Sequence, residues 1–562
     1  MTILTATELS ALVTELLPVA TIADLLELTP PDHQASIQVQ GYYAAGDGGG
    51  GPPRYWSAAS TATHNGGSVL RPDSAPAAGR WLASSAHQWT AKEFGAYNDD
   101  TNAATTLAAI IAAYAASKHV LFTAGTYNLG ATSGSAALVS VDGGQSSIGL
   151  LTEGKVLFKC ASAASSRGFF FKFKDAVGIT IGSPHFQDTG FVAETTGAYG
   201  IYLEAASGEP TKGVTFDAIH GVNVAAPLLV AGTFANDRVS GISGGVINAD
   251  TCDYGANFSN NGDDVEIDAI YTKSVSRSYF AYGVTRHTIN IFSEASIASS
   301  ADVMIQAGQL SGYDTSDLKI RYASRNTANT NALVSFMIFG ENTKAIRNID
   351  LNLDIVTSTA AKKVLFSAYN AAGTVENTGA TNNIWDQFFI KGYVSGGAGE
   401  TAIFSCQPTS KGYAEISSGL AGTIDSTMHQ QFRLVGPLLQ FTPRIDGLTA
   451  AGLGTYTEQV GRAQRVGNRM YIEIRLAWTA HTGTGNTSVA GLPLSSSVNT
   501  NPPLTVFASN FAWTAGNQLS AAVNASATTI NLLQMDPAGG GAGLVPIDTA
   551  ATLYLSGMYE VN

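Results

Sequence analysis

The sequence DVEIDAIYTKSVSRSYFAYGVTRHTINIFSEASIASSADVMIQAG, residues 264–308, contains one arrangement twice. VEIDAI, from Val265, alternates apolar and polar residues and is followed by a second apolar run, SYFAYG. INIFSE, from Ile289, is followed in the same way by DVMIQAG. Alternation with a period of two is the pattern of a β-strand that buries one face. The repeated pair of strands indicates a β architecture that is built from successive similar units.

The same pair of strands recurs towards the C-terminus. Further first strands begin at Leu318, Ile349 and Phe388, so that successive units lie 24, 29, 31 and 39 residues apart. These spacings fit the coils of a solenoid with loops of different size inserted at the turns. No segment with helical periodicity lies between the strands, which disfavours a doubly wound α/β fold. We therefore predict an all-β protein whose central part, residues 89–428, is a right-handed parallel β-helix.

The composition agrees with β structure that has many tight turns. Of the 562 residues, 60 are Gly, 45% are hydrophobic and 13% are charged. A chain with this apolar content is not disordered. The net charge of −13 argues against nucleic acid or an anionic membrane as the main partner.

The cysteines and the N-terminus bear on the compartment in which the protein works. Cys160, Cys252 and Cys406 are odd in number and widely separated, so we predict buried small side chains rather than disulfides or metal ligands. The N-terminus lacks the basic start and apolar core of a secretory signal, and no apolar run is long enough to span a membrane. We expect no membrane insertion, and release from the cell by lysis, as for a virion component.

Residues 1–34 are predicted to form an N-terminal helical segment. The helix, over residues 5–28, begins with a capping box at Thr5, is interrupted at Pro18 and ends before Pro30. Its apolar stripe must be buried by self-association, by docking into a larger assembly or by the domain that follows.

Two further domains are predicted from a change of pattern. Residues 35–88 combine short alternating strands with Gly-rich turns and form a small β domain. The run Gly48–Gly51 lacks the strand-to-helix context and the following Lys-Ser/Thr of a phosphate-binding loop. Residues 429–562 form a C-terminal β-sandwich, because MYIEIRLAW, 470–478, alternates strictly, like a half-buried strand of an antiparallel sheet.

Two stretches near the N-terminus resemble a known family. GYYAAGDGGGGPPRYW, 41–56, with Gly-Arg-Trp at 79–81, is similar to the N-terminal connector of many phage tailspikes and depolymerases. Phe-Gly-Ala at 94–96, Asp-Asp-Thr at 99–101 and Gly-Thr-Tyr at 125–127 follow in the order found at the start of pectate-lyase-like tailspike β-helices.

The chain departs from that pattern in two turns. The usual Gly-Asp-Gly before the acidic pair is shortened to Tyr97-Asn98, and the usual double Pro is replaced by Thr123-Ala124. The helix that follows, capped by Asp99, Asp100 or Thr101, would cover the open end of the β-helix.

The resemblance implies a homotrimeric bacteriophage tailspike, a capsular polysaccharide depolymerase with a pectate-lyase-like parallel β-helix. Such a protein is a part of the virion and attaches to phage tail or baseplate proteins through its N-terminus. It binds a bacterial surface polysaccharide, either capsule or O-antigen, and cleaves it without a cofactor. Its C-terminal β-sandwich either trimerises the spike or binds sugars.

Cleavage of a glycosidic bond needs one protonated carboxyl group for the leaving oxygen and one carboxylate for water or the anomeric carbon. If Val265 points inward, Glu266 and Asp268 point outward together, about 6.6 Å apart along the strand. Glu294 would lie one coil further and two positions along, and Asp217 would lie on the ladder of Asp268 from an earlier coil. We predict these four carboxylates as catalytic, against the plainer interpretation that they are ordinary solvated residues.

The stretch from Arg277 to Ile305 resembles a segment that recurs in pectate-lyase-like tailspikes. We expect Tyr279 and Tyr282 to stack on sugar rings, and Arg286 and His287 to hold a sugar carboxylate. The alternative is that alternate aromatic side chains fill the interior of the coil, with Phe280 in the core, and that Arg286 and His287 are turn or capping residues.

Two other functions stay open. A polysaccharide lyase would cleave a uronate-containing polymer by β-elimination, with His287 as its general base. A non-enzymatic receptor-binding tail protein would bind the polymer without cleaving it.

Other carboxylates are less informative. Asp263-Asp264 after Asn-Gly indicates a turn, whereas Asp250, Asp253 and Asp302 remain further carboxylate candidates. No metalloprotease, EF-hand or serine-hydrolase motif is present, so we expect no metal, although loop carboxylates would suit Ca²⁺.

Overall fold

A computed structural model describes most of the chain. The described residues are 17–31, 35–74, 77–84, 86–132, 134–163, 167–193, 195–206, 209–232, 238–259, 262–294, 301–307, 314–325, 334–340, 346–356, 364–367, 385–395, 402–405, 412–418, 432–466, 469–497, 502–539 and 541–561. The chain divides into two compact units, Met1–Asp350 with Ile355–Asn383, and Leu351–Asp354 with Ile384–Asn562.

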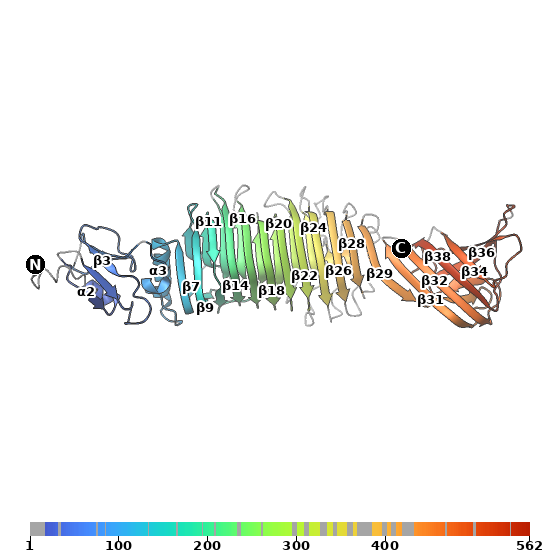
Figure 1. The fold of residues 1–562 in the computed structure, drawn as a ribbon, viewed down its shortest axis with the longest axis horizontal. Coiled ribbons are helices and arrows are strands. Elements are labelled where there is room, and N and C mark those ends of the chain that lie inside the picture. The colour runs from blue at the N-terminus through green and yellow to red at the C-terminus, as the bar shows by residue number, and fades with distance from the viewer. Residues whose placement is uncertain are drawn as a thin grey trace, which may run out of the picture. The chain divides into compact units, whose positions relative to one another are not determined.

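The first unit begins with a small sheet and one helix (Figure 1). Its elements are β1 (Leu17–Val19), α2 (Ile22–Glu27), β2 (Ser36–Val39), β3 (Arg54–Ser57), β4 (Val69–Leu70) and β5 (Arg80–Leu82), and the sheet order is β1-β2-β3-β5-β4. Thr21 begins α2 in a capping box with Asp24. The predicted helix is therefore confirmed only from Ile22. Residues 17–19 form a strand instead, and the part of the predicted helix over residues 5–16 lies outside the described residues.

Asp47 organises the Gly-rich loop after β2. Its carboxylate accepts hydrogen bonds of 2.7–3.1 Å from the N–H groups of Tyr42, Tyr43, Ala44 and Gly49. Burial acts to raise the pKa of Asp47, but these N–H groups outweigh it and hold the pKa below its usual value. The loop is a turn closed on itself by a carboxylate, which agrees with its lack of the phosphate-loop context.

A helix covers the N-terminal end of the central domain. β6 (Trp89–Thr90), the 3₁₀ helix η1 (Ala91–Phe94) and α3 (Ala103–Ala116) lead into it. The ring of Tyr114 lies 6.3–6.5 Å from the rings of Phe122, Phe171 and Phe173, which fill the first coils. The predicted covering helix is thus confirmed.

The predicted acidic cap of α3 is wrong. The N-cap residue is Asn102, whose side chain makes no capping hydrogen bond. Asp99 instead accepts hydrogen bonds from the hydroxyl and the N–H of Thr101, at 2.5 and 3.1 Å. Asp100 forms an ion pair of 2.5 Å with Lys159 in the second coil. Both carboxylates therefore shape the turn before the helix.

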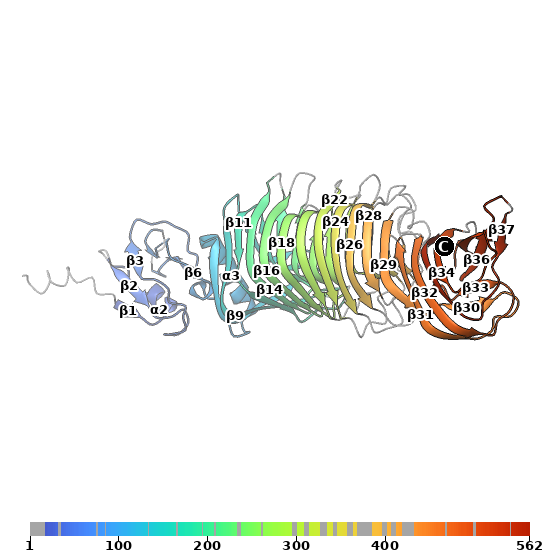
Figure 2. The ribbon, with the colours of Figure 1, turned by 45° about the vertical axis from the view of Figure 1, so that its right-hand side comes forward.

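The rest of the first unit is a parallel β-helix with two sheets (Figures 1 and 2). The long sheet contains β7 (His119–Thr132), β9 (Ile148–Ser162), β11 (Val177–Ile181), β12 (Pro184–Asp188), β14 (Thr211–Val222), β16 (Val239–Asp250), β18 (Gly262–Lys273), β20 (Thr285–Ser293), β22 (Thr315–Ser324) and β24 (Ile346–Val356). The short sheet contains β8 (Ala137–Asp142), β10 (Phe169–Lys174), β13 (Tyr199–Ala205), β15 (Ala226–Gly232), β17 (Tyr254–Ser259), β19 (Arg277–Tyr282), β21 (Ala301–Ala307), β23 (Val334–Gly340) and β25 (Val364–Ser367). Successive strands of each sheet pair in parallel. The predicted parallel β-helix is confirmed.

The register of the long sheet differs from the prediction by two residues. Val265 pairs with His287 rather than with Ile289, so Glu266 pairs with Thr288 and not with Asn290. A bulge follows, because Ile267 pairs with Ile289 whereas Ile270 pairs with Ile291. A register shift of two residues keeps each side chain on the same face of the sheet. The outward direction predicted for Glu266 is therefore confirmed, but the residue predicted to pair with it on the next strand is wrong.

Two of the three cysteines lie in the protein interior, as predicted. Cys160 and Cys252 are free and buried, and burial raises the pKa of the Cys252 thiol to about 12. Both predictions of a buried thiol are confirmed, whereas Cys406 lies outside the described residues. In the described part of the chain, no helix combines the length and the apolar character needed to cross a membrane.

The second unit joins a few parallel strands to an antiparallel sandwich (Figure 2). β26 (Trp385–Ser395), β28 (Gly412–Ser418) and β29 (Phe432–Phe441) pair in parallel, and β27 (Ala402–Ser405) comes between β26 and β28 in the chain. One antiparallel sheet follows β29 through β31 (Gly454–Val466), β32 (Arg469–His481), β38 (Ala551–Glu560) and β34 (Pro503–Ser509). The other contains β30 (Arg444–Gly447), β33 (Thr487–Ala490), β36 (Thr529–Met535), β35 (Gln518–Val523) and β37 (Ala542–Leu544).

The alternation that predicted this sandwich marks its core. The buried hydrophobic side chains of β32 are Met470, Ile472, Ile474, Leu476 and Trp478. The half-buried strand of an antiparallel sheet is confirmed. The boundary at 428/429 stays a prediction, because it lies within 419–431, outside the described residues.

Candidate functional site

Two pairs of stacked rings, with an asparagine between them, form one ladder on the outer face of the long sheet. The register aligns His185, His220, Asn248, Tyr271 and Phe292, one from each successive coil. We call these five residues the ring ladder. The two histidine rings are parallel, with centroids 4.1 Å apart and an interplanar angle of 6°, and those of Tyr271 and Phe292 lie 4.9 Å apart at 15°. Tyr271 is 46% exposed, so the ladder offers flat ring surfaces to a ligand.

The histidines of the ladder are neutral at neutral pH. Partial burial, the adjacent His220 and the charge of Lys155 lower the pKa of His185 to about 4. Partial burial and Lys155 also lower the pKa of His220. Asn248 supports the pair, because its amide Nδ2 lies 3.1 Å from Nδ1 of His220. The two rings thus serve as uncharged surfaces.

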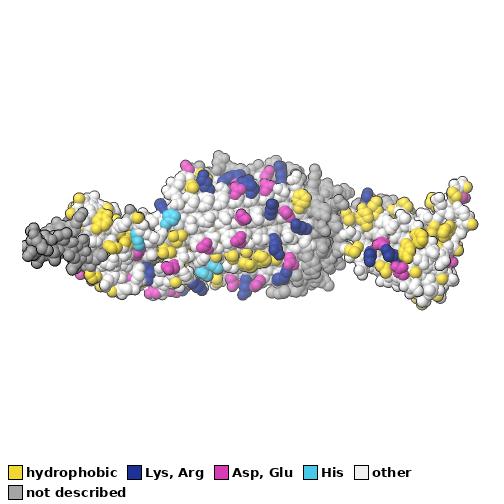
Figure 3. All heavy atoms as spheres, viewed as in Figure 1, with side chains coloured by type: hydrophobic (Ala, Val, Ile, Leu, Met, Phe, Trp, Pro, Cys, Tyr) yellow, Lys and Arg dark blue, Asp and Glu magenta, His cyan; other side chains and the backbone are white. Residues whose placement is uncertain are grey.

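Three of the predicted catalytic carboxylates lie beside the ring ladder. Asp217 on β14 and Glu266 and Asp268 on β18 are exposed. Figure 3 shows acidic side chains in the middle of this face and a band of hydrophobic and histidine side chains next to them. The parallel β-sheet holds the three carboxylates on a rigid frame, as a catalytic site requires.

Asp217 and Asp268 lie on one ladder of the long sheet with a glycine between them. Gly244 pairs with Phe216 and with Ile267, and the next pairs are in step, so Asp217, Gly245 and Asp268 are in line. The alignment of Asp217 with Asp268 that the sequence predicted is therefore confirmed. A Cβ atom at Gly245 would lie 2.3 Å from the Asp217 carbonyl oxygen, so this position excludes a side chain. Two strand spacings, about 9–10 Å, separate the two carboxylate-bearing strands.

Glu294, the fourth predicted carboxylate, does not lie in this group. Thr272 pairs with Ser293, which places Glu294 opposite Lys273 at the far end of the strands. It lies six residues beyond Thr288, the partner of Glu266, and that corresponds to roughly 20 Å of extended strand. The sequence predicted Glu294 two positions beyond the partner of Asp268. The register sets Asp268 beside Asn290, four residues before Glu294, so the predicted proximity is wrong.

His287 and Tyr279 are interior residues. Both are 0% exposed, and the Tyr279 hydroxyl lies 2.6 Å from Nδ1 of His287 while Nε2 of His287 lies 3.0 Å from the Gly262 carbonyl oxygen. Burial lowers the pKa of His287 to about 4. The neutral ring therefore donates to Gly262 and accepts from Tyr279. The structure corrects the prediction that these two side chains contact sugar, and leaves His287 no free nitrogen for a lyase mechanism.

The aromatic residues of β19 have the opposite phase to the one expected. Tyr279 and Ala281 point inward, and Phe280 and Tyr282 take the alternate positions, with Phe280 partly exposed and Tyr282 6% exposed. Predicting Phe280 for the core was therefore wrong. Tyr282 belongs to the short sheet, whereas Glu266 belongs to the long sheet.

Arg286 is exposed at the start of β20. Its guanidinium forms an ion pair with Asp264, with Nη2 2.9 Å from Oδ2. This hydrogen-bonded pair raises the pKa of Arg286 and lowers that of Asp264. Both residues have left-handed backbone, with φ of 57° and 53°. The turn predicted at Asp263-Asp264 is wrong, because both residues lie in strand β18. A sugar carboxylate would have to compete with Asp264 for Arg286.

The remaining carboxylate candidates have structural partners. Asp302 is buried and accepts hydrogen bonds from the hydroxyls of Ser278 and Tyr322 inside the β-helix. Asp253 pairs with Arg167 at 2.9 Å. Among the described residues, no group of three or more His, Cys, Asp or Glu side chains is placed to hold a metal ion.

The ring ladder could not be found from sequence. Its members are separated by 35, 28, 23 and 21 residues, and no fixed period connects them. The available signal is that each is an outward residue near the end of a first strand of a coil. Alignment of those strands requires the register, which the loops and the bulge change from coil to coil.

These features define a parallel β-helix protein that presents carboxylates and rings on one sheet face, behind a small N-terminal β domain. Residues 18–85 match the model of a family described as the phage tail protein small four-stranded β-sheet domain. The resemblance to phage tailspikes is confirmed in two respects, the N-terminal domain by this match and the β-helix by the strand pairing of the chain itself.

Several solved structures are similar to this chain. One is the tailspike protein gp49 from Acinetobacter baumannii bacteriophage Fri1, a capsular polysaccharide depolymerase, with 12% identity, 97% of this chain and 98% of that chain covered, and a TM-score of 0.41. Another is the full-length tailspike protein 2 from Escherichia coli O157:H7 bacteriophage CAB120, with 13% identity, 95% and 71% covered, and a TM-score of 0.44. A third is WceF of Pantoea stewartii, a glycan biofilm modifying enzyme with a tailspike-like parallel β-helix fold, with 9% identity, 96% and 69% covered, and a TM-score of 0.27. No curated protein matches the sequence.

Proposed function

We propose that the chain is a phage tailspike that binds a bacterial surface polysaccharide, capsule or O-antigen, and cleaves it by glycosidic hydrolysis. The observation that carries this proposal is the position of Asp217, Glu266 and Asp268, three exposed carboxylates beside the ring ladder on one rigid sheet face. Sugar units stack with their apolar faces on the rings, and the carboxylates act on the bond between two such units.

Hydrolysis breaks the bond between the anomeric carbon and the glycosidic oxygen. One carboxylic acid gives its proton to the departing oxygen, and a second, ionised carboxylate takes a proton from the water that attacks the anomeric carbon. Asp217 and Asp268 are about 9–10 Å apart by strand spacing, and Glu266 and Asp268 are about 7 Å apart along the strand. Inverting glycosidases hold their carboxyl groups roughly 6.5–9.5 Å apart to leave room for that water. We therefore propose hydrolysis with inversion.

The assembly and the location are part of the same proposal. The phage-tail family match of residues 18–85 supports attachment to tail or baseplate proteins through the N-terminus, and so a place in the virion. We propose a homotrimer, in which a neighbouring subunit or the bound polymer covers the exposed carboxylates and excludes water from them.

Carboxylate-to-amide substitutions test the site. We expect Asp217→Asn, Glu266→Gln and Asp268→Asn to lower the rate of polymer cleavage, by about 10²-fold or more for the acid and the base, because an amide neither donates nor takes the proton. Glu294→Gln is the matched control, since Glu294 is an exposed carboxylate just after the end of β20, away from the group. The rate is measured from the reducing ends released from host polysaccharide.

Three outcomes distinguish the alternatives. Full activity of all three variants would remove the site assignment and leave the fold untouched. Products that absorb in the near ultraviolet would show an unsaturated sugar and hence a lyase. Binding without any change in polymer length would show a receptor-binding protein.

A further inference from the structure

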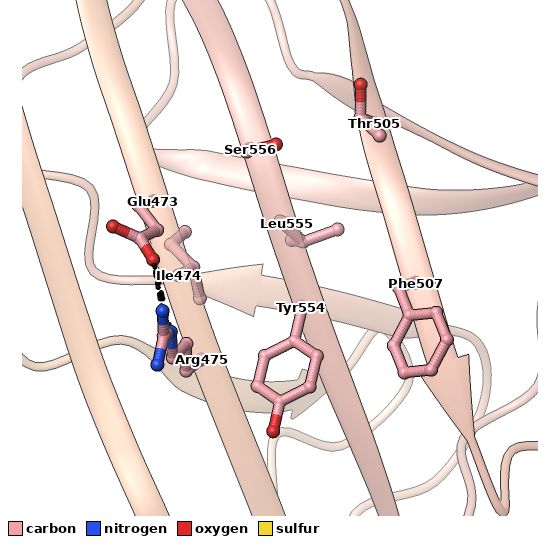
Figure 4. A pocket seen from close by; sticks show the side chains of 8 residues that line it. All are labelled: Glu473, Ile474, Arg475, Thr505, Phe507, Tyr554, Leu555 and Ser556. Carbon is pink, nitrogen blue, oxygen red and sulfur yellow. Dashed lines mark hydrogen bonds and ion pairs between the residues drawn. The ribbon is translucent and has the colours of Figure 1, made fainter.

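The C-terminal sandwich has an aromatic hollow on its outer surface that cleavage at the β-helix does not use (Figure 4). The hollow has a volume of about 450 Å³. It is lined by Glu473, Ile474, Arg475, Thr505, Phe507, Tyr554, Leu555 and Ser556. Small-ligand pockets usually measure roughly 300–1,000 Å³. A mono- or disaccharide would therefore fit.

Two rings form the floor of this hollow. Phe507 on β34 pairs in register with Tyr554 on β38, and their rings are nearly parallel, at 16° with centroids 5.9 Å apart. Figure 4 shows the two rings side by side. Phe507 is 61% exposed, and a large apolar ring open to water usually marks a binding surface when polar groups surround it.

Polar groups surround the rings. Arg475 forms an ion pair with Glu473, with Nη2 2.7 Å from Oε1, and its guanidinium lies 5.9 Å from the centre of the Tyr554 ring. The hydroxyls of Thr505 and Ser556 project from the two neighbouring strands (Figure 4). Donors and acceptors therefore stand together next to a flat apolar surface, and the two charges balance.

We propose that this hollow binds a neutral pyranose unit of a glycan. The apolar face of the sugar lies on Phe507 and Tyr554, and two adjacent sugar hydroxyls bond to Arg475 and Glu473, one accepting and one donating. A protein partner would remove this ion pair from water, at a cost that the attraction of the pair often fails to offset. A sugar replaces the water with hydroxyl groups and keeps both charges bonded. The site would hold the polymer whether or not the β-helix cleaves it.

Saccharide binding to the full-length chain tests this proposal. The probes are neutral oligosaccharides of glucose, galactose, N-acetylglucosamine and rhamnose, measured by calorimetry and by saturation-transfer NMR. The Asp268→Asn variant serves as the background, so that cleavage does not disturb the measurement. We expect saturable binding of at least one probe, which Phe507→Ala weakens at least about tenfold by removing the stacking surface. Phe507→Tyr should retain it.

Tyr471→Ala is the matched control. Tyr471 is 45% exposed on β32, outside the hollow, so its removal should leave binding unchanged. Absence of saturable binding for every probe would overturn the proposal, as would equal losses in Phe507→Ala and Tyr471→Ala. A fall in native mass of Phe507→Ala would show a subunit contact instead. Each of these results is independent of whether the wild-type chain cleaves polysaccharide.

Discussion

At the scale of single residues, His287 shows how a side chain expected at the surface can belong to the interior. His287 was a candidate for sugar binding, but its imidazole lies in the interior between the Tyr279 hydroxyl and the Gly262 carbonyl oxygen. In the ladder it pairs with Val265 in the preceding strand and with Leu318 in the following one. From sequence alone, such a histidine is assigned to the surface because it is polar. The hydrogen bonds that allow its burial depend on residues that only the fold brings near it.

The burial of His287 predicts a loss of stability in acid. Its pKa is about 4 in the folded chain, against an ordinary value near 6.5. The unfolded chain therefore takes up the proton first, so the stabilisation is complete above about pH 6.5 and decreases as the pH falls towards 4, by up to about 3 kcal/mol. Thermal unfolding midpoints between pH 7.5 and 4 measure this decrease.

A variant separates His287 from the other histidines. His287→Leu should be less stable at neutral pH, because the Gly262 carbonyl and the Tyr279 hydroxyl lose their partner, but should show a flatter pH dependence. His185→Gln is a second test of the same linkage, because the pKa of His185 is also about 4, and it should flatten the pH dependence as well. An unchanged pH dependence in His287→Leu would contradict the buried neutral histidine.

At the scale of the elements, the buried faces of the regularly alternating strands could be predicted, whereas the face of β19 and the register could not. Alternation in VEIDAI and MYIEIRLAW set the buried side of β18 and β32 correctly, because burial depends on parity alone. The bulge between Ile267 and Ile270 and the loops between coils set the register. Their effect is to bring together residues from five coils, and that alignment depends on contacts between strands rather than on local sequence.

The ring ladder makes a prediction at this scale. Tyr271→Ala and Phe292→Ala should each weaken polysaccharide binding about tenfold, because each removes one surface of a stacked pair. Val222→Ala is the control, as Val222 is 41% exposed on β14 and lies outside the ladder. The affinity of each variant for host polysaccharide is measured by calorimetry and compared with that of the wild type. Equal affinities in the wild type and in both ring variants would mean that the polymer binds elsewhere.

At the scale of the molecule, the order of domains followed from changes of pattern along the chain. The Gly-rich connector motif indicated the phage-tail domain that residues 18–85 match, and the repeated strand pairs indicated the β-helix. A trimer and its contacts leave no comparable pattern, because an interface between subunits selects complementary surfaces and not a periodicity.

The native mass tests the proposed trimer. One chain has a mass of 58.3 kDa, so sedimentation equilibrium should give about three times this value, independent of protein concentration in the micromolar range. Deletion of residues 1–88 should leave this mass ratio and the cleavage rate unchanged, since the proposed site lies in the β-helix. A monomer that cleaves at the wild-type rate would contradict the role given to neighbouring subunits.

The central claim, that the chain hydrolyses a bacterial surface polysaccharide, is tested most directly by digestion of purified host polysaccharide in water enriched in ¹⁸O, followed by mass spectrometry. Hydrolysis adds one water to each broken bond. We predict shorter chains that carry one ¹⁸O atom at each new reducing end and have no near-ultraviolet absorbance, with their release much reduced in Asp268→Asn. Polymer of unchanged length, or fragments without ¹⁸O, would contradict the account.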